Sequence, residues 1–138
     1  MRNVNNPSQS SFLSREAKIE IQKKLYETRP RVGKFDQAIA KGELPSVEEF
    51  RQICRDRGQI IHDENTLNPS TLSEALIKDA ERLERAANGD GDELIAEALK
   101  HADFYKWLGA DAEPDKYKTD IDGWNRLAES AKATNEQK

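Results

Sequence analysis

Histidine and cysteine, whose side chains do acid–base and nucleophilic chemistry near neutral pH, are rare in this 138-residue sequence: it contains two histidines, His62 and His101, and one cysteine, Cys54. A cysteine becomes a nucleophile when an imidazole lies beside it. Cys54, however, falls on the apolar side of a predicted helix with Phe50 and Ile53, where a thiol is protonated and inert. We therefore expect Cys54 to be a core residue and the protein not to be an enzyme.

Two stretches contain residue types that bind metal ions but lack the complete pattern of ligands. His101 follows Glu97 by four residues, so both lie on one helical face, but nothing in the spacing requires a third ligand. We therefore expect His101 to be a surface residue. The acidic turn 88–93 has the composition of a calcium loop, yet Glu93 and Leu99 stand where that loop needs glycine and glutamate. We predict no metal and no cofactor.

The residues with the strongest indication of binding are aromatic. Phe104, Tyr105 and Trp107 fall within four positions near the end of one predicted helix, so they cannot all face the same side of it. Tyr105 continues the inward stripe, whereas Phe104 and Trp107 lie off it. The latter two either pack against the last helix, which we favour, or enter a groove of a partner protein, because tryptophan and tyrosine dominate interface hot spots. The predicted partner-binding residues are Phe104, Tyr105, Trp107 and Trp124.

A second candidate surface is basic. Residues 35–57 read as two short helices across a glycine-containing turn, the outline of a DNA-binding helix-turn-helix. The side chains that would contact phosphates or guanine edges are Arg51, Arg55 and Arg57, which we expect to point mostly outward. Against this, Glu48 and Glu49 occupy the first turn of the second helix, where carboxylates repel phosphate. The pI of about 5.3 is also far from basic, so nucleic-acid binding is the alternative prediction.

The composition predicts a folded helical protein with a thin core. Hydrophobic residues make up 36% of the sequence and charged residues 35%, the latter above the ~25% of typical domains. Fifteen alanines against three valines favour helix over strand. A thin core often leaves apolar surface that a partner or a second copy covers, so a homo-oligomer is also considered.

Charge is distributed unevenly along the chain. Residues 1–62 carry 12 basic and 8 acidic side chains, a net of +4, whereas residues 63–138 carry 10 and 18, a net of −8. The acidic half would suit a basic partner protein. The first nine residues lack the apolar run of a signal peptide, and no stretch approaches the ~18 apolar residues of a membrane span. We predict a cytoplasmic protein without membrane contact.

The elements that position these residues are helices, and the clearest is a hairpin over about 70–108. Two such apolar faces should pack antiparallel. Thr71 and Glu74 have the spacing of a capping box, and Gly89 and Asp90 suit the end of one helix and the start of the next. Apolar residues recur every three or four positions on both sides of the turn: Leu72, Leu76, Ala80, Leu83 and Ala87, then Leu94, Ala98, Ala102, Tyr105 and Leu108.

Helices are also predicted before the hairpin. The first begins at the N-cap Ser14 and ends before Pro30, because proline disfavours a helical residue ahead of it. A basic linker and a short helix at 35–41 follow, and Gly42 is placed to end that helix.

Two more helices complete the prediction. Ser46 opens one in a capping box, and Gly58 ends it. Residues 59–62 then form an extended segment. A last helix begins at Thr119 or Asp120, and its apolar residues are Ile121, Trp124, Leu127, Ala128 and Ala131.

Together these patterns predict an all-α protein, a small bundle of about five helices organised on the antiparallel hairpin. A flexible polar tail over 1–11 precedes a single helical domain over 12–133, and residues 134–138 fray. The predicted function is that of a non-enzymatic intracellular protein-binding protein. Such a protein would be an adaptor, a chaperone-like escort, an inhibitor or an antidote-type regulator that occupies a partner.

Overall fold

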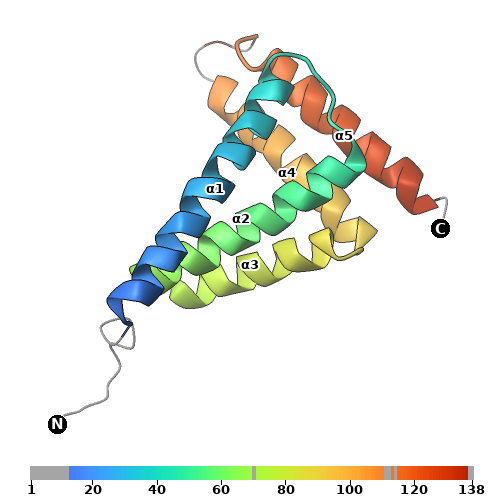
Figure 1. Cartoon of the computed structure of the whole chain (residues 1–138). Helices are drawn as coiled ribbons and strands as arrows, with labels where there is room; N and C mark the ends of the chain where they lie inside the picture. The colour runs from blue at the N-terminus through green and yellow to red at the C-terminus, as the bar shows by residue number, and fades with distance from the viewer. Residues whose placement is uncertain (1–12, 70, 111–112, 114, 137–138) are drawn as a thin grey trace.

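The computed structural model describes residues 13–69, 71–110, 113 and 115–136, and within these ranges it contains five α-helices and no strand. The predicted all-α bundle is confirmed. In Figure 1, α2 and α3 lie side by side, and α4 and α5 pack on one another. The predicted tail at 1–11 lies outside the described residues. The helices are α1 (Arg15–Ala40), α2 (Val47–Leu67), α3 (Ser73–Ala87), α4 (Gly91–Gly109) and α5 (Lys118–Glu136).

The first helix is longer than predicted, because α1 passes through Pro30 without ending. A proline inside a helix costs about 3 kcal/mol, since it removes one backbone N–H and crowds the preceding turn. Contacts next to Pro30 hold the helix against α2: Arg31 donates two 2.9 Å hydrogen bonds to Asp56, and Phe35 is buried one turn later. Tertiary packing therefore outweighs the local cost, and the predicted linker and separate helix at 35–41 are wrong.

Helix α2 also runs past its predicted end at Gly58. Its start is as predicted: the Ser46 hydroxyl accepts from the Glu49 amide, and the Glu49 carboxylate accepts from the Ser46 amide. Gly58 is a contact point and not a stop, because a Cβ at this position would lie 3.3 Å from the carbonyl oxygen of Ala80 in α3. The missing side chain lets the two helices approach closely. Residues 59–62, predicted as extended, are helical.

The predicted hairpin of α3 and α4 forms around a tight turn. Gly89 has a φ of 118°, in the left-handed region that glycine favours, and Asp90 caps α4 by accepting from the Glu93 amide. The start of α3 differs from the prediction. The helix begins at Ser73, one residue too late for Thr71 to serve as the N-cap, so the predicted capping box of Thr71 and Glu74 is not formed.

The two hairpin helices pack more extensively on other helices than on each other. From the turn they diverge, α3 following α2 and α4 following α5 (Figure 1). The apolar stripe of α3 therefore meets α2, where a Cβ at Gly58 would lie 3.6 Å from the Cβ of Leu83. The hairpin therefore connects two pairs of packed helices, α2 with α3 and α4 with α5.

The core is centred on three aromatic rings from three helices. Phe35 of α1, Phe50 of α2 and Trp124 of α5 have ring centroids 5.8 to 6.0 Å apart. Helix α5 can approach α1 because residue 123 is glycine: a Cβ at Gly123 would lie 2.6 Å from Cγ2 of the buried Ile39. Close approach at one glycine thus allows the large indole of the next residue to reach the centre of the bundle.

The last helix begins at Lys118, so Thr119 and Asp120, predicted as caps, lie within its first turn. It continues to Glu136, beyond the predicted fraying point at residue 134. Across the described ranges, no helix combines the length and apolar character needed to cross a membrane. The buried residues of α5 include four of those predicted: Trp124, Leu127, Ala128 and Ala131.

Candidate functional site

The C-terminal end of α4 presents large apolar side chains to solvent. Trp107 is 72% exposed and Phe104 is 50% exposed, and their ring centroids lie 6.3 Å apart. Leu108, one turn beyond Phe104, is also exposed. We call Phe104, Trp107 and Leu108 the aromatic surface. Because the helix already fixes their backbone, binding through these side chains would require little additional ordering.

The favoured prediction for Phe104 and Trp107, packing against the last helix, is wrong. Helix α5 covers the side of α4 that carries Ala98 and Ala102. A residue in an α-helix is rotated by about 100° from its neighbour, so Phe104 and Trp107 lie about 160° and 140° from Ala102 around the axis. They therefore face almost the opposite direction from α5.

The other two predicted partner-binding residues are placed differently. Trp124 is 1% exposed and stacks on the imidazole of His101, with ring centroids 4.1 Å apart, so it is a core residue and not part of an exposed surface. Tyr105 is half-buried, with its ring centroid 5.5 Å from those of both Phe104 and Tyr117. Burial raises the pKa of the Tyr105 hydroxyl, which stays protonated at neutral pH. It supports the aromatic surface from one side.

A cleft of about 440 Å³ opens beside the aromatic surface, where α1, α2, α3 and α4 meet. Its volume falls within the range of small-molecule sites. Phe104 forms part of its wall, so the cleft and the aromatic surface share this side chain. The rest of the lining combines apolar side chains with charged ones: Val32, Ile60, Ile61 and Leu83, and Arg57, Asp79, Glu97, Lys100 and His101.

Buried Glu97 lies at the centre of a charge network in this cleft. Its Oε2 lies 2.8 Å from Nε2 of His101, and its Oε1 lies 2.9 Å from Nη2 of Arg82. Arg82 also contacts Oδ1 of Asp79 at 2.7 Å, and Nζ of Lys100 approaches the same oxygen at 3.7 Å. Each of the two carboxylates that line the cleft therefore has two cationic or imidazole partners.

The protonation state of Glu97 follows from these contacts. Burial disfavours its charged form, but the hydrogen bonds and charges of His101 and Arg82 outweigh burial and lower the pKa of Glu97 to about 2. Glu97 is thus a fixed negative charge at neutral pH. His101, predicted to lie on the surface, is instead half-buried, because its ring is held between Glu97 and the indole of Trp124.

Arg57 is another charged residue of the cleft lining. Its Nη2 lies 2.6 Å from Oδ1 of Asp36, whereas its enclosed Nε has no hydrogen-bond partner among the described residues. Burial raises the pKa of the Asp36 carboxyl, although the charge of Arg57 opposes this shift. The guanidinium therefore makes one short contact, and its buried Nε donates no hydrogen bond within the described ranges.

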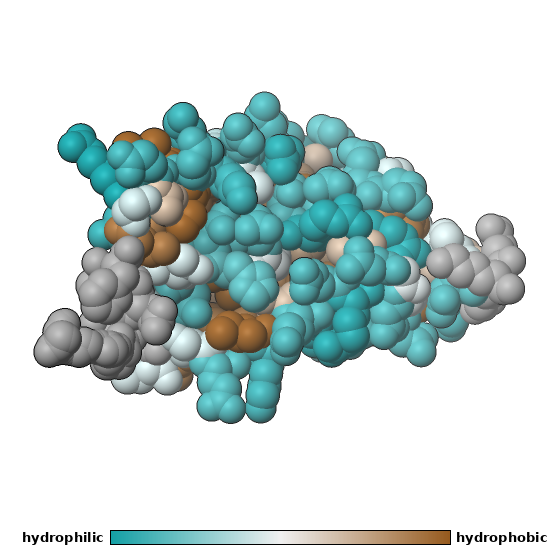
Figure 2. Space-filling model, turned by 60° about the horizontal axis from the view of Figure 1, so that its bottom comes forward, coloured by the Kyte–Doolittle hydropathy of each residue, from teal (hydrophilic) through white to brown (hydrophobic). Residues whose placement is uncertain are grey.

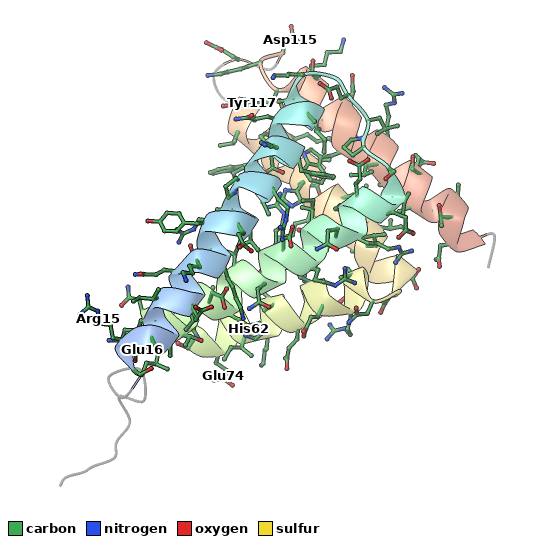
Figure 3. The ribbon with its side chains drawn as sticks, viewed as in Figure 1. Arg15, Glu16, His62, Glu74, Asp115 and Tyr117 are labelled. Carbon is green, nitrogen blue, oxygen red and sulfur yellow. The ribbon has the colours of Figure 1, made fainter. Side chains whose placement is uncertain are left out.

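The remaining chemistry-bearing residues do not form a reactive centre. Burial, together with the charge of Glu97, raises the pKa of the Cys54 thiol to about 12, so it stays protonated. His62 lies on α2 toward the end of the molecule where Glu74 is labelled, far from Tyr117 (Figure 3). In the part of the chain that the structure describes, no three histidine, cysteine or carboxylate side chains are grouped to hold a metal ion.

The arginines predicted as nucleic-acid contacts are engaged within the protein. Arg51 is buried, and its Nη1 donates to the carbonyl oxygen of Ala86 at 3.3 Å. Nη2 of the exposed Arg55 donates to the carbonyl oxygen of Ala87 at 3.3 Å. Both therefore bind the C-terminal end of α3, where carbonyls lack helical partners and the helix dipole is negative. Arg51 and the half-buried Arg57 do not point outward as expected, and nucleic-acid binding stays a prediction.

The cleft was missed in the sequence because its walls come from four helices that are distant along the chain. One feature could have indicated it: Glu97 stands directly before Ala98 within an apolar stripe, where an unpaired carboxylate would be costly.

No family model, curated protein or solved structure matches the chain.

Proposed function

We propose that this chain is a non-enzymatic protein-binding protein that occupies a partner through the aromatic surface. The observation that carries the proposal is the exposure of Trp107 and Phe104 side by side on α4, on the side of the helix that α5 leaves uncovered. Tryptophan is among the residues most enriched at interface hot spots. Neighbouring exposed apolar side chains on a rigid element are typical of interaction sites.

The energetics support binding through these two rings. A large aromatic side chain buries about 150–250 Å², and burial of apolar area stabilises by about 25 cal/mol per Å². Covering the exposed part of Trp107 would thus contribute on the order of 3–4 kcal/mol. Ordering a side chain at an interface costs only about 0.5–1.5 kcal/mol, so covering Trp107 would give a net gain toward the roughly 4–15 kcal/mol that association of two molecules costs.

The charge distribution indicates the kind of partner. Residues 63–138, which include α3, α4 and α5, have a net charge of −8. A basic protein partner would be attracted to this half, with the main effect on association rate and specificity. The proposed roles are those of an adaptor, a chaperone-like escort, an inhibitor or an antidote-type regulator in the cytoplasm. A second copy of this chain is the alternative partner.

Site-specific photocrosslinking in the native host tests the proposal. A photoreactive amino acid replaces Trp107 in one variant and Tyr26 in the other. Tyr26 is a matched control, because it is an exposed aromatic residue of α1, at 78%, outside the aromatic surface. A protein captured from position 107 and not from position 26 supports the proposal. The same set of captured proteins from both positions contradicts it.

Once a partner is captured, its affinity provides the quantitative test. Replacing a hot-spot tryptophan costs about 2 kcal/mol or more, so Trp107→Ala should weaken binding about 30-fold, whereas Tyr26→Ala should leave it unchanged. Sedimentation equilibrium of the free chain separates the two kinds of partner. A dimer that disappears in Trp107→Ala would identify a second copy as the occupant.

A further inference from the structure

We propose that the cleft between α1, α2, α3 and α4 binds a small monocarboxylate with an apolar body, such as a medium-chain aliphatic acid. This inference goes beyond protein binding through the aromatic surface, although Phe104 contributes to both sites. It rests on the shape and lining of the cleft and on which of its polar groups already have partners.

The apolar part of the ligand is matched by side chains from all four helices. Val32 of α1, Ile60 of α2, Leu83 of α3 and Phe104 of α4 line a space of about 440 Å³. Such a mainly apolar space with few charged groups is characteristic of sites that hold a small ligand by its body and orient it by its head group. An aliphatic chain would lie against these side chains and exclude water from them.

The charged head group is indicated by the partners that the cleft already provides. Asp79 contacts Arg82 and Lys100, and Glu97 contacts Arg82 and His101. Oε1 of Glu97 lacks good hydrogen-bond geometry, but it lies 2.9 Å from the Arg82 guanidinium. The negative charges of the cleft are therefore compensated within the protein.

Lys100 is the cation of the cleft with uncommitted donors. Its Nζ makes only a 3.7 Å contact with Asp79, and its side chain is 61% exposed. Arg57 also lines the cleft and pairs with Asp36, but its Nε, which has no acceptor in the described ranges, is enclosed and is not exposed to a ligand in the cleft. A carboxylate supplies acceptors and charge-assisted bonds. An ammonium would instead meet carboxylates that already pair with Arg82, Lys100 or His101.

The experiment compares three ligands of equal length on the full chain: octanoate, octanamide and octylamine. Calorimetry measures their affinities. Fluorescence of Trp124 in a Trp107→Phe background reports occupancy, because His101 lines the cleft and stacks on Trp124. We expect octanoate to bind about tenfold more tightly than octanamide, since its head group makes charge-assisted bonds, and octylamine to bind most weakly.

Two lysines on the same helix give matched variants. Lys100 lines the cleft, whereas Lys106 is similarly exposed, contacts Asp103 at 3.9 Å and does not line it. Lys100→Gln should weaken octanoate binding about five- to tenfold and leave octanamide unchanged. Lys106→Gln should change neither. Val32→Phe, which fills the cleft without altering its charge, should weaken both ligands.

Three outcomes would overturn the inference. Equal affinity for octanoate and octanamide would show that no cation recognises the head group. Tightest binding of octylamine would show that the carboxylates dominate the cleft. The absence of saturable octanoate binding would show that the cleft does not take this ligand class. None of these results bears on the partner captured through Trp107, so the two proposals fail independently.

Discussion

The two tryptophans of this protein lie on neighbouring helices in opposite environments. Trp124 is enclosed by Phe35, Phe50 and His101, whereas the nearest ring to the exposed Trp107 is that of Phe104. Both residue type and helical context are shared, so neither explains the difference. It arises because α5 meets α1, α2 and α4, while none of the five described helices covers the outer side of α4 at its C-terminal end.

Apolar surface has a different role around each of the two tryptophans. Around Trp124, apolar side chains from several helices are buried and stabilise the fold. Around Trp107, apolar area stays in contact with water. A second exposed apolar region lies at the left end of the molecule in Figure 2, where the brown atoms mark the place at which α1, α2 and α3 meet. Changes near Trp124 should therefore affect folding strongly, and changes near Trp107 should affect folding little.

The largest effect is expected for Trp124→Ala. Removing a buried tryptophan leaves a cavity and costs about 3–5 kcal/mol, which is a large fraction of the stability of a typical domain. The free energy of unfolding measured by urea denaturation, with circular dichroism as the signal, checks this value. A loss below about 1 kcal/mol would contradict the contrast between the two tryptophans, because Trp124 would then contribute no more than a surface residue.

Acidification should destabilise the fold through Glu97, whose partner His101 stacks on Trp124. The pKa of Glu97 in the folded protein is about 2, below its ordinary 4.5. The unfolded chain therefore binds this proton more readily, and the stabilisation is present above the ordinary pKa and lost as the pH falls toward 2. The expected loss is on the order of 2–3 kcal/mol.

The measurement is a series of urea titrations from neutral to acidic pH, with wild type compared to Glu97→Gln. Burial raises the pKa of Asp36, and the charge of Glu97 adds to this shift. Asp36 therefore changes stability in the opposite direction, and the difference between the two proteins reports Glu97 together with its effect on Asp36. Parallel curves for wild type and Glu97→Gln would contradict the prediction.

Two glycines sharpen the contrast between packed and open positions within helices. A Cβ at Gly123 would lie 2.6 Å from Cγ2 of the buried Ile39, whereas a Cβ at Gly33 would meet nothing within 4 Å. Gly123→Ala should destabilise by about 1–3 kcal/mol through overpacking. Gly33→Ala should stabilise by about 0.5–1 kcal/mol, because alanine favours the helix. Thermal unfolding of both variants checks the opposite signs, and equal signs would contradict the packing described for α5.

The smallest change in stability is expected for Trp107→Ala. Its side chain is exposed, so the free energy of unfolding should change by no more than about 0.5 kcal/mol. The fluorescence of this variant should come only from Trp124 and be shifted to shorter wavelength than that of wild type, since the remaining indole is shielded from water. Destabilisation by more than about 2 kcal/mol would falsify the assignment of Trp107 to a free surface.

Several parts of the fold could be predicted because they depend on neighbouring residues. The caps at Ser14, Ser46 and Asp90 and the turn at Gly89 follow from hydrogen bonds between residues a few positions apart. The burial of Leu94, Ala98 and Ala102 in α4 follows from the helical period, whereas Leu108, predicted to continue this stripe, is exposed. These interactions are complete within one or two turns of helix, so no knowledge of the rest of the molecule is needed.

Other positions followed local rules that packing overrode. Pro30 was expected to end a helix and lies inside α1, because Arg31 and Phe35 hold the chain against neighbouring helices. Gly58 was expected to end a helix and instead lies within α2 at a close contact with α3. In both cases the local preference is a few kcal/mol at most, and contacts with a distant segment exceed it.

From the sequence alone, the amphipathic period and the polar caps determine that this chain forms helices and which side of each helix is apolar. Only the tertiary structure decided which of those sides are covered: Trp124 of α5 is buried and Trp107 of α4 stays in water, and the packing of the helices brings Arg57 of α2 and Glu97 and Lys100 of α4 to one cleft. The physical reason is the separation along the sequence over which each kind of interaction acts. Backbone hydrogen bonds in a helix join residues four apart, whereas burial and charge pairing depend on segments brought together from the whole chain.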